Sequence, residues 1–108
     1  MWRPKTGQEE TNIYLMLNHR NGFIKIGRSK NPTFREKQLQ SEEPEIELLD
    51  SVQAHYIWEQ ELHFQFRKKK IRGEWFSLTN EDLLSIRNLF QTKRDRDKRL
   101  KGVQASVP

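Results

Sequence analysis

The sequence predicts a small α+β fold in which helices flank an antiparallel sheet of about three strands. Two apolar runs joined by an Asn-Gly turn, a third apolar run, and apolar residues at helical spacing between them support this class. The chain has 108 residues, which suits one compact domain without room for a second independent core. Because charged residues make up 32% of the chain, nearly as much as the hydrophobic residues, we expect a small core with solvated ends.

The first two apolar runs predict a β-hairpin. Residues 13–17 and 23–27 have the composition of buried strands, and Asn21-Gly22 closes the turn between them, a pair that favours tight hairpin turns. Residues 46–52 predict a third strand, and residues 75–78 predict a short buried segment.

A first helix is expected from Pro32 to about Gln40. Asn31 precedes it as the N-cap, and proline suits the first turn because a helix leaves the N–H at that position unpaired. Phe34 and Leu39 are its expected apolar contacts.

Two further helices follow the third strand. Residues 54–66 place apolar side chains at helical spacing on one face, and the basic residues 67–72 then predict a loop. Thr79 and Asp82 form a capping-box pattern, which predicts the start of the last helix. Leu83, Ile86 and Phe90 are its expected apolar stripe.

Charge is concentrated near the C-terminus. The net charge is +5, and residues 93–101 alone contribute six basic residues against two aspartates. We therefore divide the chain into a disordered lead-in at residues 1–11, a folded domain at 12–92 and a basic tail at 93–108. The tail favours a nucleic-acid partner, although charge runs are also commonly solvated surface. The basic residues expected to contact a nucleic acid are Arg28, Lys30, Arg67, Lys68, Lys69, Lys70, Arg72, Lys93, Arg94, Arg96, Lys98, Arg99 and Lys101.

Several classes of protein are excluded by composition. The chain has no cysteine, which rules out disulfides, thiolate zinc sites and a cysteine nucleophile. No apolar run approaches the roughly 18 residues of a membrane span, and residues 1–10 lack the apolar stretch of a signal peptide. We expect a cytoplasmic protein without a membrane partner.

A polar stripe accompanies the expected second helix. His55, Glu59 and His63 recur at intervals of four residues beside the apolar face, so Glu59 is expected at the edge of the core. A carboxylate there must be paired, protonated or bound to a cation. A salt bridge is the ordinary interpretation. A zinc site made by all three residues is a weaker alternative, because one helix rarely wraps three ligands around a tetrahedral ion.

Tyr14 and Lys25 interrupt otherwise apolar strands, and Arg35 lies one turn into the first helix. Taken singly, each has an ordinary explanation: a hydrogen-bonded phenol, a lysine whose stem covers apolar surface, and a solvated arginine.

Taken in order, these residues resemble the GIY-YIG nuclease superfamily. The likeness rests on Tyr14, on Lys25-Ile26-Gly27, on Arg35 and on Glu59 followed by Leu62-His63. With Gly73-Glu74-Trp75-Phe76, these residues most resemble the branch found in phage proteins and in meiotically up-regulated fungal proteins.

The resemblance implies an endonuclease that hydrolyses phosphodiester bonds with a divalent metal, Mg²⁺ or alternatively Mn²⁺. Glu59 would be the metal ligand, Arg35 would hold the phosphate oxygens, and Tyr14 would position or deprotonate water or contact the phosphate. The partner would be DNA, single- or double-stranded, with low intrinsic sequence specificity unless another chain supplies it. For a phage-encoded protein the location would be the host cytoplasm.

The sequence departs from the family pattern in three places. The second tyrosine is Lys25, which would clamp phosphate, or act as a base only if desolvation lowered its pKa. A histidine common one turn after the arginine is Leu39, and His63 could take a proton-transfer role instead. A late asparagine is missing, and Glu74 nearby is either a second acidic group or structural. A catalytically inactive nucleic-acid-binding module of the same fold is therefore the alternative function.

Overall fold

The computed structural model describes the backbone of residues 10–106 and the side chains of residues 10–101. The chain divides into two compact units, Met1–Leu78 and Thr79–Pro108, and each is a structural body of its own. The expected disordered lead-in lies outside the described residues as far as residue 9, and the first strand already begins at Glu10.

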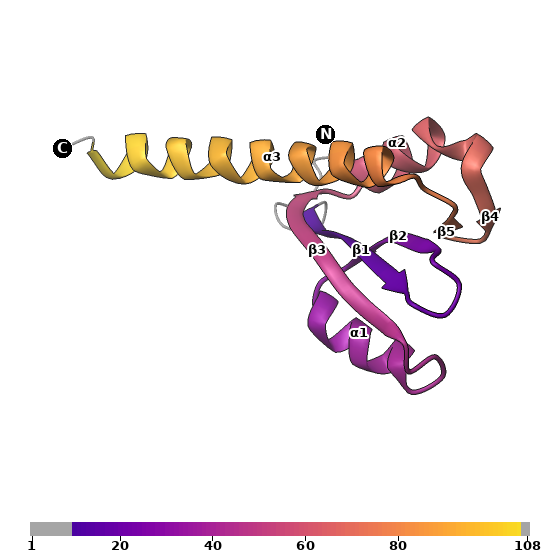
Figure 1. Cartoon of the computed structure of the whole chain (residues 1–108). Helices are drawn as coiled ribbons and strands as arrows, with labels where there is room; N and C mark the ends of the chain where they lie inside the picture. Colours follow the sequence, from indigo (N-terminus) through magenta and orange to yellow (C-terminus); the bar gives the residue numbers. More distant parts are fainter. Residues whose placement is uncertain (1–9, 107–108) are drawn as a thin grey trace, which may run out of the picture. The chain divides into compact units, whose positions relative to one another are not determined.

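The first unit contains a five-stranded antiparallel sheet (Figure 1). Its strands lie in the order β3-β1-β2-β5-β4. The predicted α+β class is confirmed, with five strands in place of about three. The strand bounds are β1 Glu10–Asn18, β2 Ile24–Ser29, β3 Ile46–His55, β4 Lys70–Arg72 and β5 Trp75–Phe76.

The two additional strands form a small hairpin where the sequence predicted a loop. Gly73 supplies the turn between β4 and β5 with a φ of 56°, a conformation that glycine adopts without steric cost. All three residues of β4 are exposed, so the strand shows no alternation of buried apolar and exposed polar residues. Without that alternation the sequence could not predict a strand here.

The predicted hairpin at the start of the chain is confirmed. β1 and β2 pair antiparallel, and Gly22 adopts a φ of 77° and donates its N–H to the carbonyl of Asn18 over 2.7 Å. In this register Tyr14 lies opposite Gly27, and Met16 lies opposite Lys25.

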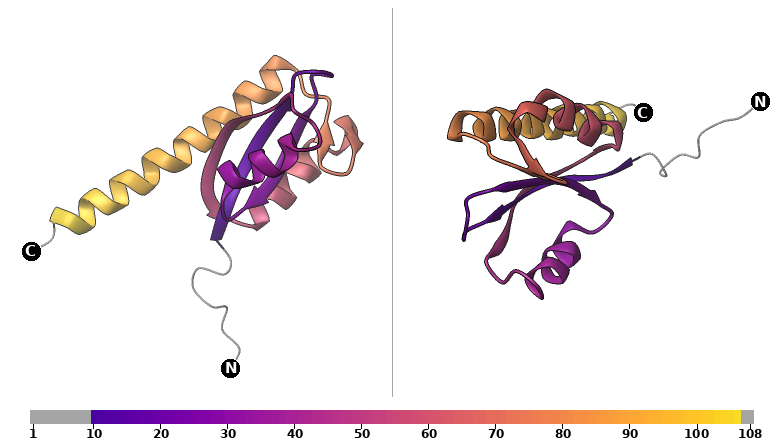
Figure 2. Two further views of the ribbon diagram at one scale, coloured as in Figure 1. Left: turned by 90° about the horizontal axis from the view of Figure 1, so that it is seen from below. Right: turned by 90° about the vertical axis from the view of Figure 1, so that its right-hand side faces the viewer.

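Two helices, α1 (Pro32–Gln40) and α2 (Ile57–Gln65), lie on opposite sides of the sheet (Figure 2). The Asn31 side chain accepts the N–H of Phe34 at 3.1 Å, so the predicted cap is confirmed. Phe34 itself is 57% exposed, and its predicted apolar contact is wrong. Because Phe34 and Leu39 are five residues apart, about 140° around the helix, only Leu39 packs on the core.

The second helix starts later than predicted. Ala54 and His55 belong to β3, where they lie opposite Thr11 and Glu10 of β1. The prediction that the helix begins at residue 54 is therefore wrong, because the long β1 strand provides antiparallel partners for these residues. A 3-10 turn, η1 (Arg67–Lys69), follows α2.

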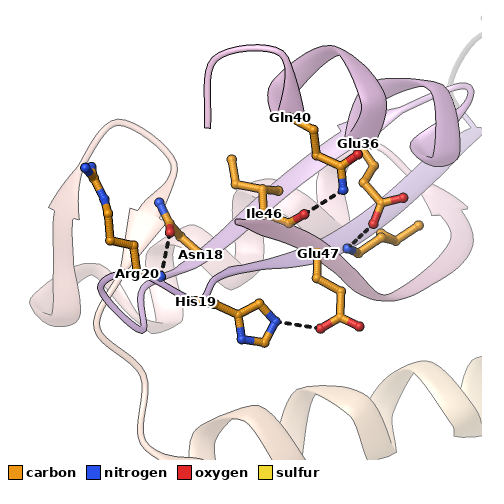
Figure 3. Close-up of polar contacts among 8 residues, drawn as sticks. Asn18, His19, Arg20, Glu36, Gln40, Ile46 and Glu47 are labelled. Carbon is orange, nitrogen blue, oxygen red and sulfur yellow. Dashed lines mark hydrogen bonds and ion pairs between the residues drawn. The ribbon is translucent and has the colours of Figure 1, made fainter. Parts of the chain in front are cut away.

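Polar contacts tie α1 to β3 and fix the geometry of the sheet edge (Figure 3). The Glu36 carboxylate accepts the N–H of Leu48 at 2.6 Å, and the Gln40 amide donates to the carbonyl of Ile46 at 2.7 Å. Beneath these contacts Tyr14, Met16 and Ile46 form a buried cluster, against which Leu39, Leu48 and Trp75 pack.

The second unit is one helix, α3 (Asn80–Ser106). The capping box is confirmed: Thr79 N–H donates to Asp82 Oδ2, and Asp82 N–H donates to Thr79 Oγ1, each at 3.0 Å. Ile86 and Phe90 are buried as predicted. The helix includes the basic residues from Lys93 onward. Neither α3 nor any other described helix is long and apolar enough to cross a membrane.

Candidate active site

The four residues that carry the family likeness lie close enough in the structure to influence one another electrostatically. Tyr14 comes from β1, Lys25 from β2, Arg35 from α1 and Glu59 from α2. Arg35 acts on the Tyr14 phenol and lowers its pKa, and Glu59 acts electrostatically on Tyr14 and is itself influenced by Lys25. Glu74, in the turn between β4 and β5, acts on both Tyr14 and Glu59.

Tyr14 is almost completely buried, with 1% of its surface exposed. Burial raises the pKa of its phenol above the ordinary value near 10, and the nearby Arg35 guanidinium opposes that increase. The nearby carboxylates of Glu74 and Glu59 raise the pKa further. Tyr14 is therefore a neutral phenol at neutral pH, which can orient a partner through its hydroxyl but is not a ready base.

Gly27 explains why the phenol fits. A Cβ atom built at this position would lie 2.5 Å from both Cζ and the hydroxyl oxygen of Tyr14. No side chain larger than hydrogen is compatible with that approach unless Tyr14 moves. The glycine of the Lys25-Ile26-Gly27 triplet thus makes room for the tyrosine opposite it.

Glu59 has the features expected of a carboxylate that binds a cation. Its Oε2 atom is buried and has no hydrogen-bond partner among the described residues. Burial raises the pKa of the carboxyl, Glu74 raises it further, and His63, Arg28 and Lys25 lower it. A buried oxygen without a donor is unfavourable, and a bound cation would remove that cost.

The zinc alternative is wrong. His55 lies in β3, and its Nδ1 accepts the N–H of Ile57 at 3.1 Å, so the expected helical stripe of three ligands does not form. Within the described residues there is no group of three or more histidine or acidic side chains that could hold a metal ion. A site with a single carboxylate suits Mg²⁺, which retains several waters.

Lys25 is paired with Glu74. Its Nζ lies 2.9 Å from Glu74 Oε2 and 5.6 Å from the centroid of the Trp75 ring, and only 9% of the residue is exposed. The carbonyl of Glu74 also accepts the N–H of Ile26 at 3.0 Å, so backbone and side chain both fix it beside β2. Sequence reasoning left Glu74 undecided, because the β4–β5 hairpin that places it there was not predicted.

His63 contacts the backbone of β2. Its Nε2 is 2.7 Å from the carbonyl oxygen of Ile26, and its ring meets that of Phe76 edge-on at 4.9 Å. A carbonyl only accepts hydrogen bonds, so Nε2 carries the proton and Nδ1 remains for other contacts. The structure thus shows His63 supporting β2, and its proton-transfer role remains a prediction.

The predicted basic residues fall into three places. Arg28 and Lys30 line a hollow of about 400 Å³ at the end of β2, where the Arg28 guanidinium lies 5.2 Å from the Tyr56 ring centroid. The second group, Arg67, Lys68, Lys69, Lys70 and Arg72, is exposed on η1 and β4. The third group lies on α3, in the other unit.

Fold and site together define a small α+β module in which a partly buried carboxylate, an arginine and a buried tyrosine meet beside basic surface. Residues 11–91 match the family model described as the T5orf172 domain, so the chain belongs to that family. The family is associated with endonuclease-like proteins, which indicates a nuclease-like or DNA-binding module. No curated protein and no solved structure matched the chain.

Proposed function

We propose that this protein is a metal-dependent endonuclease of the GIY-YIG type that hydrolyses phosphodiester bonds in DNA. The proposal rests on one observation above all: Glu59 keeps a buried carboxylate oxygen without a donor in the same group as Tyr14 and Arg35. Family membership and the basic residues beside the site support the same class of substrate.

Glu59 would hold the divalent metal, Mg²⁺ or Mn²⁺. When bound, the metal would neutralise charge on the scissile phosphate and on the leaving oxygen. The acidic neighbour Glu74 adds negative charge near Glu59, which favours a cation there as well.

Arg35 would hold the non-bridging phosphate oxygens, since a planar guanidinium can donate two parallel hydrogen bonds to phosphate. Its contact with the Tyr14 hydroxyl connects the phosphate position to the phenol. Tyr14, neutral and buried, would orient the attacking water through its hydroxyl. Lys25, paired with a carboxylate, would act as a phosphate clamp rather than as a base.

One observation favours the alternative of an inactive DNA-binding module. Lys25 occupies the place of the family's second tyrosine and is held by Glu74. If Lys25 cannot reach the substrate, the fold would bind DNA without cleaving it. The two functions differ in turnover, not in binding.

The test is cleavage of plasmid and single-stranded DNA by the purified protein with Mg²⁺ or Mn²⁺. Glu59→Ala should reduce the rate at least on the order of 10²-fold, and Arg35→Ala by a similar factor, because each removes transition-state charge stabilisation. Glu61→Ala is the matched control: it removes an exposed carboxylate from the same helix and should leave the rate unchanged.

Cleavage that survives intact in Glu59→Ala would refute the site. DNA binding with no turnover in the wild-type protein under either metal would establish the inactive module instead. Circular dichroism of each variant separates lost chemistry from lost folding.

A further inference from the structure

Phe64 is an exposed aromatic side chain in an unusual setting. It lies near the end of α2, and 67% of its surface is exposed. The Arg67 guanidinium carbon lies 4.1 Å from the centroid of the Phe64 ring, and Arg67 Nη1 donates to the carbonyl of Phe64 at 2.8 Å. The Arg67 guanidinium therefore lies over the Phe64 ring, and its hydrogen bond to the Phe64 carbonyl helps to hold it there.

This pair lies at the start of the most basic internal segment of the chain, which Arg67 begins. Residues 67–72 contain five cations, and no acidic residue occurs between Glu61 and Glu74. The segment is exposed throughout and includes Ile71, which is 52% exposed. A hollow of about 380 Å³, lined by residues 65–69, adjoins it. Such a surface is complementary to a nucleotide, because the aromatic ring can stack on the base and the surrounding cations can bind the phosphate backbone.

We propose that Phe64 and Arg67 form a stacking platform for an unpaired base, so that the DNA substrate is single-stranded or contains a single-stranded segment. Bases inside a duplex already stack on their neighbours and cannot offer a face to the platform. An unpaired base can stack on the aromatic ring or on the guanidinium plane, while the nearby cations hold its backbone. The proposal rests on the function proposed above and specifies its substrate.

The platform and the candidate site lie on the same rigid element. Phe64 is five residues from Glu59, which is about 7.5 Å along the helix axis. The two side chains point about 140° apart around α2, so the platform serves nucleotides that flank the cut.

Other occupants fit the platform less well. A second copy of this chain would bring five cations against five cations. A membrane surface would engage the cations but would make no use of the guanidinium placed over the ring. A single strand uses both the charge and the stacked pair, and strand selectivity is the property that distinguishes it.

The experiment is fluorescence anisotropy of a labelled oligothymidylate of about 20 nucleotides, longer than the usual binding site, and of a duplex of the same length. Measurements are made in EDTA, so that no cleavage occurs. Phe64→Ala should weaken single-strand binding at least about fivefold, because stacking on one aromatic side chain is lost. Duplex affinity should change by less than about twofold, and the salt dependence should be unchanged because no phosphate contact is removed.

Three further variants make the result specific. Phe64→Trp should retain single-strand binding, since an indole also stacks. Arg67→Lys keeps the charge but loses the planar guanidinium, so it should weaken single-strand binding more than duplex binding. Leu84→Ala removes a comparably exposed apolar side chain, 60% exposed and outside the basic segment, and should have no effect.

Equal losses for single strand and duplex, or no loss in Phe64→Ala, would overturn the platform. So would a wild-type protein that binds only vesicles of anionic lipid. Because binding is measured without metal, a failure of cleavage with this binding pattern intact would refute the nuclease and leave the platform standing.

Discussion

At the scale of single residues, the site depends on a glycine and a tyrosine that lie opposite each other on neighbouring strands of the sheet. Gly27 leaves space that the Tyr14 ring fills, so the phenol is buried where Arg35 can reach its hydroxyl. The sequence indicated both residues through their family likeness. It could not show their contact, because the contact depends on the register between β1 and β2.

Gly27→Ala is expected to destabilise the protein by about 1–3 kcal/mol, the usual cost of overpacking, because its Cβ would overlap the Tyr14 ring. Chemical denaturation measures this cost. In a Tyr14→Leu background the same substitution should cost less, since the ring that it meets is gone. Equal costs in both backgrounds would show that the overlap is relieved by movement elsewhere.

At the scale of elements, prediction succeeded where a local pattern determines the structure. The Asn21-Gly22 turn, the Asn31 cap and the Thr79 capping box are each confirmed by hydrogen bonds or dihedral angles. Prediction failed where distant pairing decides. β3 extends over Ala54 and His55 because β1 pairs with them. The local sequence around these two residues does not indicate that pairing. The β4–β5 hairpin was missed for a different reason: β4 is exposed throughout and shows no apolar alternation, so the position of Glu74 was missed with it.

The helical structure of the basic tail limits how many of its cations can contact a DNA duplex at once. Arg94, Lys98 and Lys101 recur at i, i+4 and i+7 and so lie on one side of α3. Within α3, Lys93 is paired with Asp97 at 2.7 Å, and Arg94 Nη2 donates to Gln91 Oε1 at 2.9 Å. A duplex can touch only one side of a straight helix, so about three cations rather than six are available to it at once.

Replacing Arg94, Lys98 and Lys101 together by glutamine should lower the salt slope of DNA binding by about 3, since each phosphate contact contributes about 0.9. The matched control replaces Lys93, Arg96 and Arg99, which are spread more widely around the helix, and should lower the slope less. Binding is measured by anisotropy over a range of salt concentrations. Equal effects of the two triple variants would mean that the tail acts only as diffuse charge.

At the scale of the whole molecule, the ionised Glu59 carboxylate lowers the stability of the folded chain, and the proposed metal would offset this cost. The pKa of the Glu59 carboxyl is raised in the folded state, above its ordinary value of 4.5, chiefly by burial. The contribution of Glu59 to the free energy of unfolding is therefore fully present below that ordinary pKa. It is lost as the pH rises through the raised pKa, because the ionised carboxylate is less favourable in the folded chain. A metal that binds only the folded protein reverses this loss by mass action.

In EDTA at neutral pH, Glu59→Gln should therefore melt at a higher temperature than the wild type, and the difference should disappear near pH 4. Adding Mg²⁺ should raise the Tm of the wild type but not of Glu59→Gln; a concentration 100 times the Kd gives about 2.7 kcal/mol. Glu61→Gln, on the exposed side of α2, should follow the wild type in both experiments. The Tm values of the wild type and of both variants are measured by calorimetry over a range of pH and of Mg²⁺ concentration. A Tm of Glu59→Gln at or below that of the wild type in EDTA would mean that the ionised carboxylate is stabilised by contacts within the protein.

The exposed strand β4 has a further effect on the behaviour of the free protein. β4 forms one edge of the sheet, where unpaired backbone groups can recruit a strand from another molecule and start aggregation. Lys70 and Arg72 place charge on that edge, and like charges on two approaching copies repel. The side chains proposed to hold phosphate would thus also protect the protein when no nucleic acid is bound. Neutralising them would weaken nucleic-acid binding and lower colloidal solubility together.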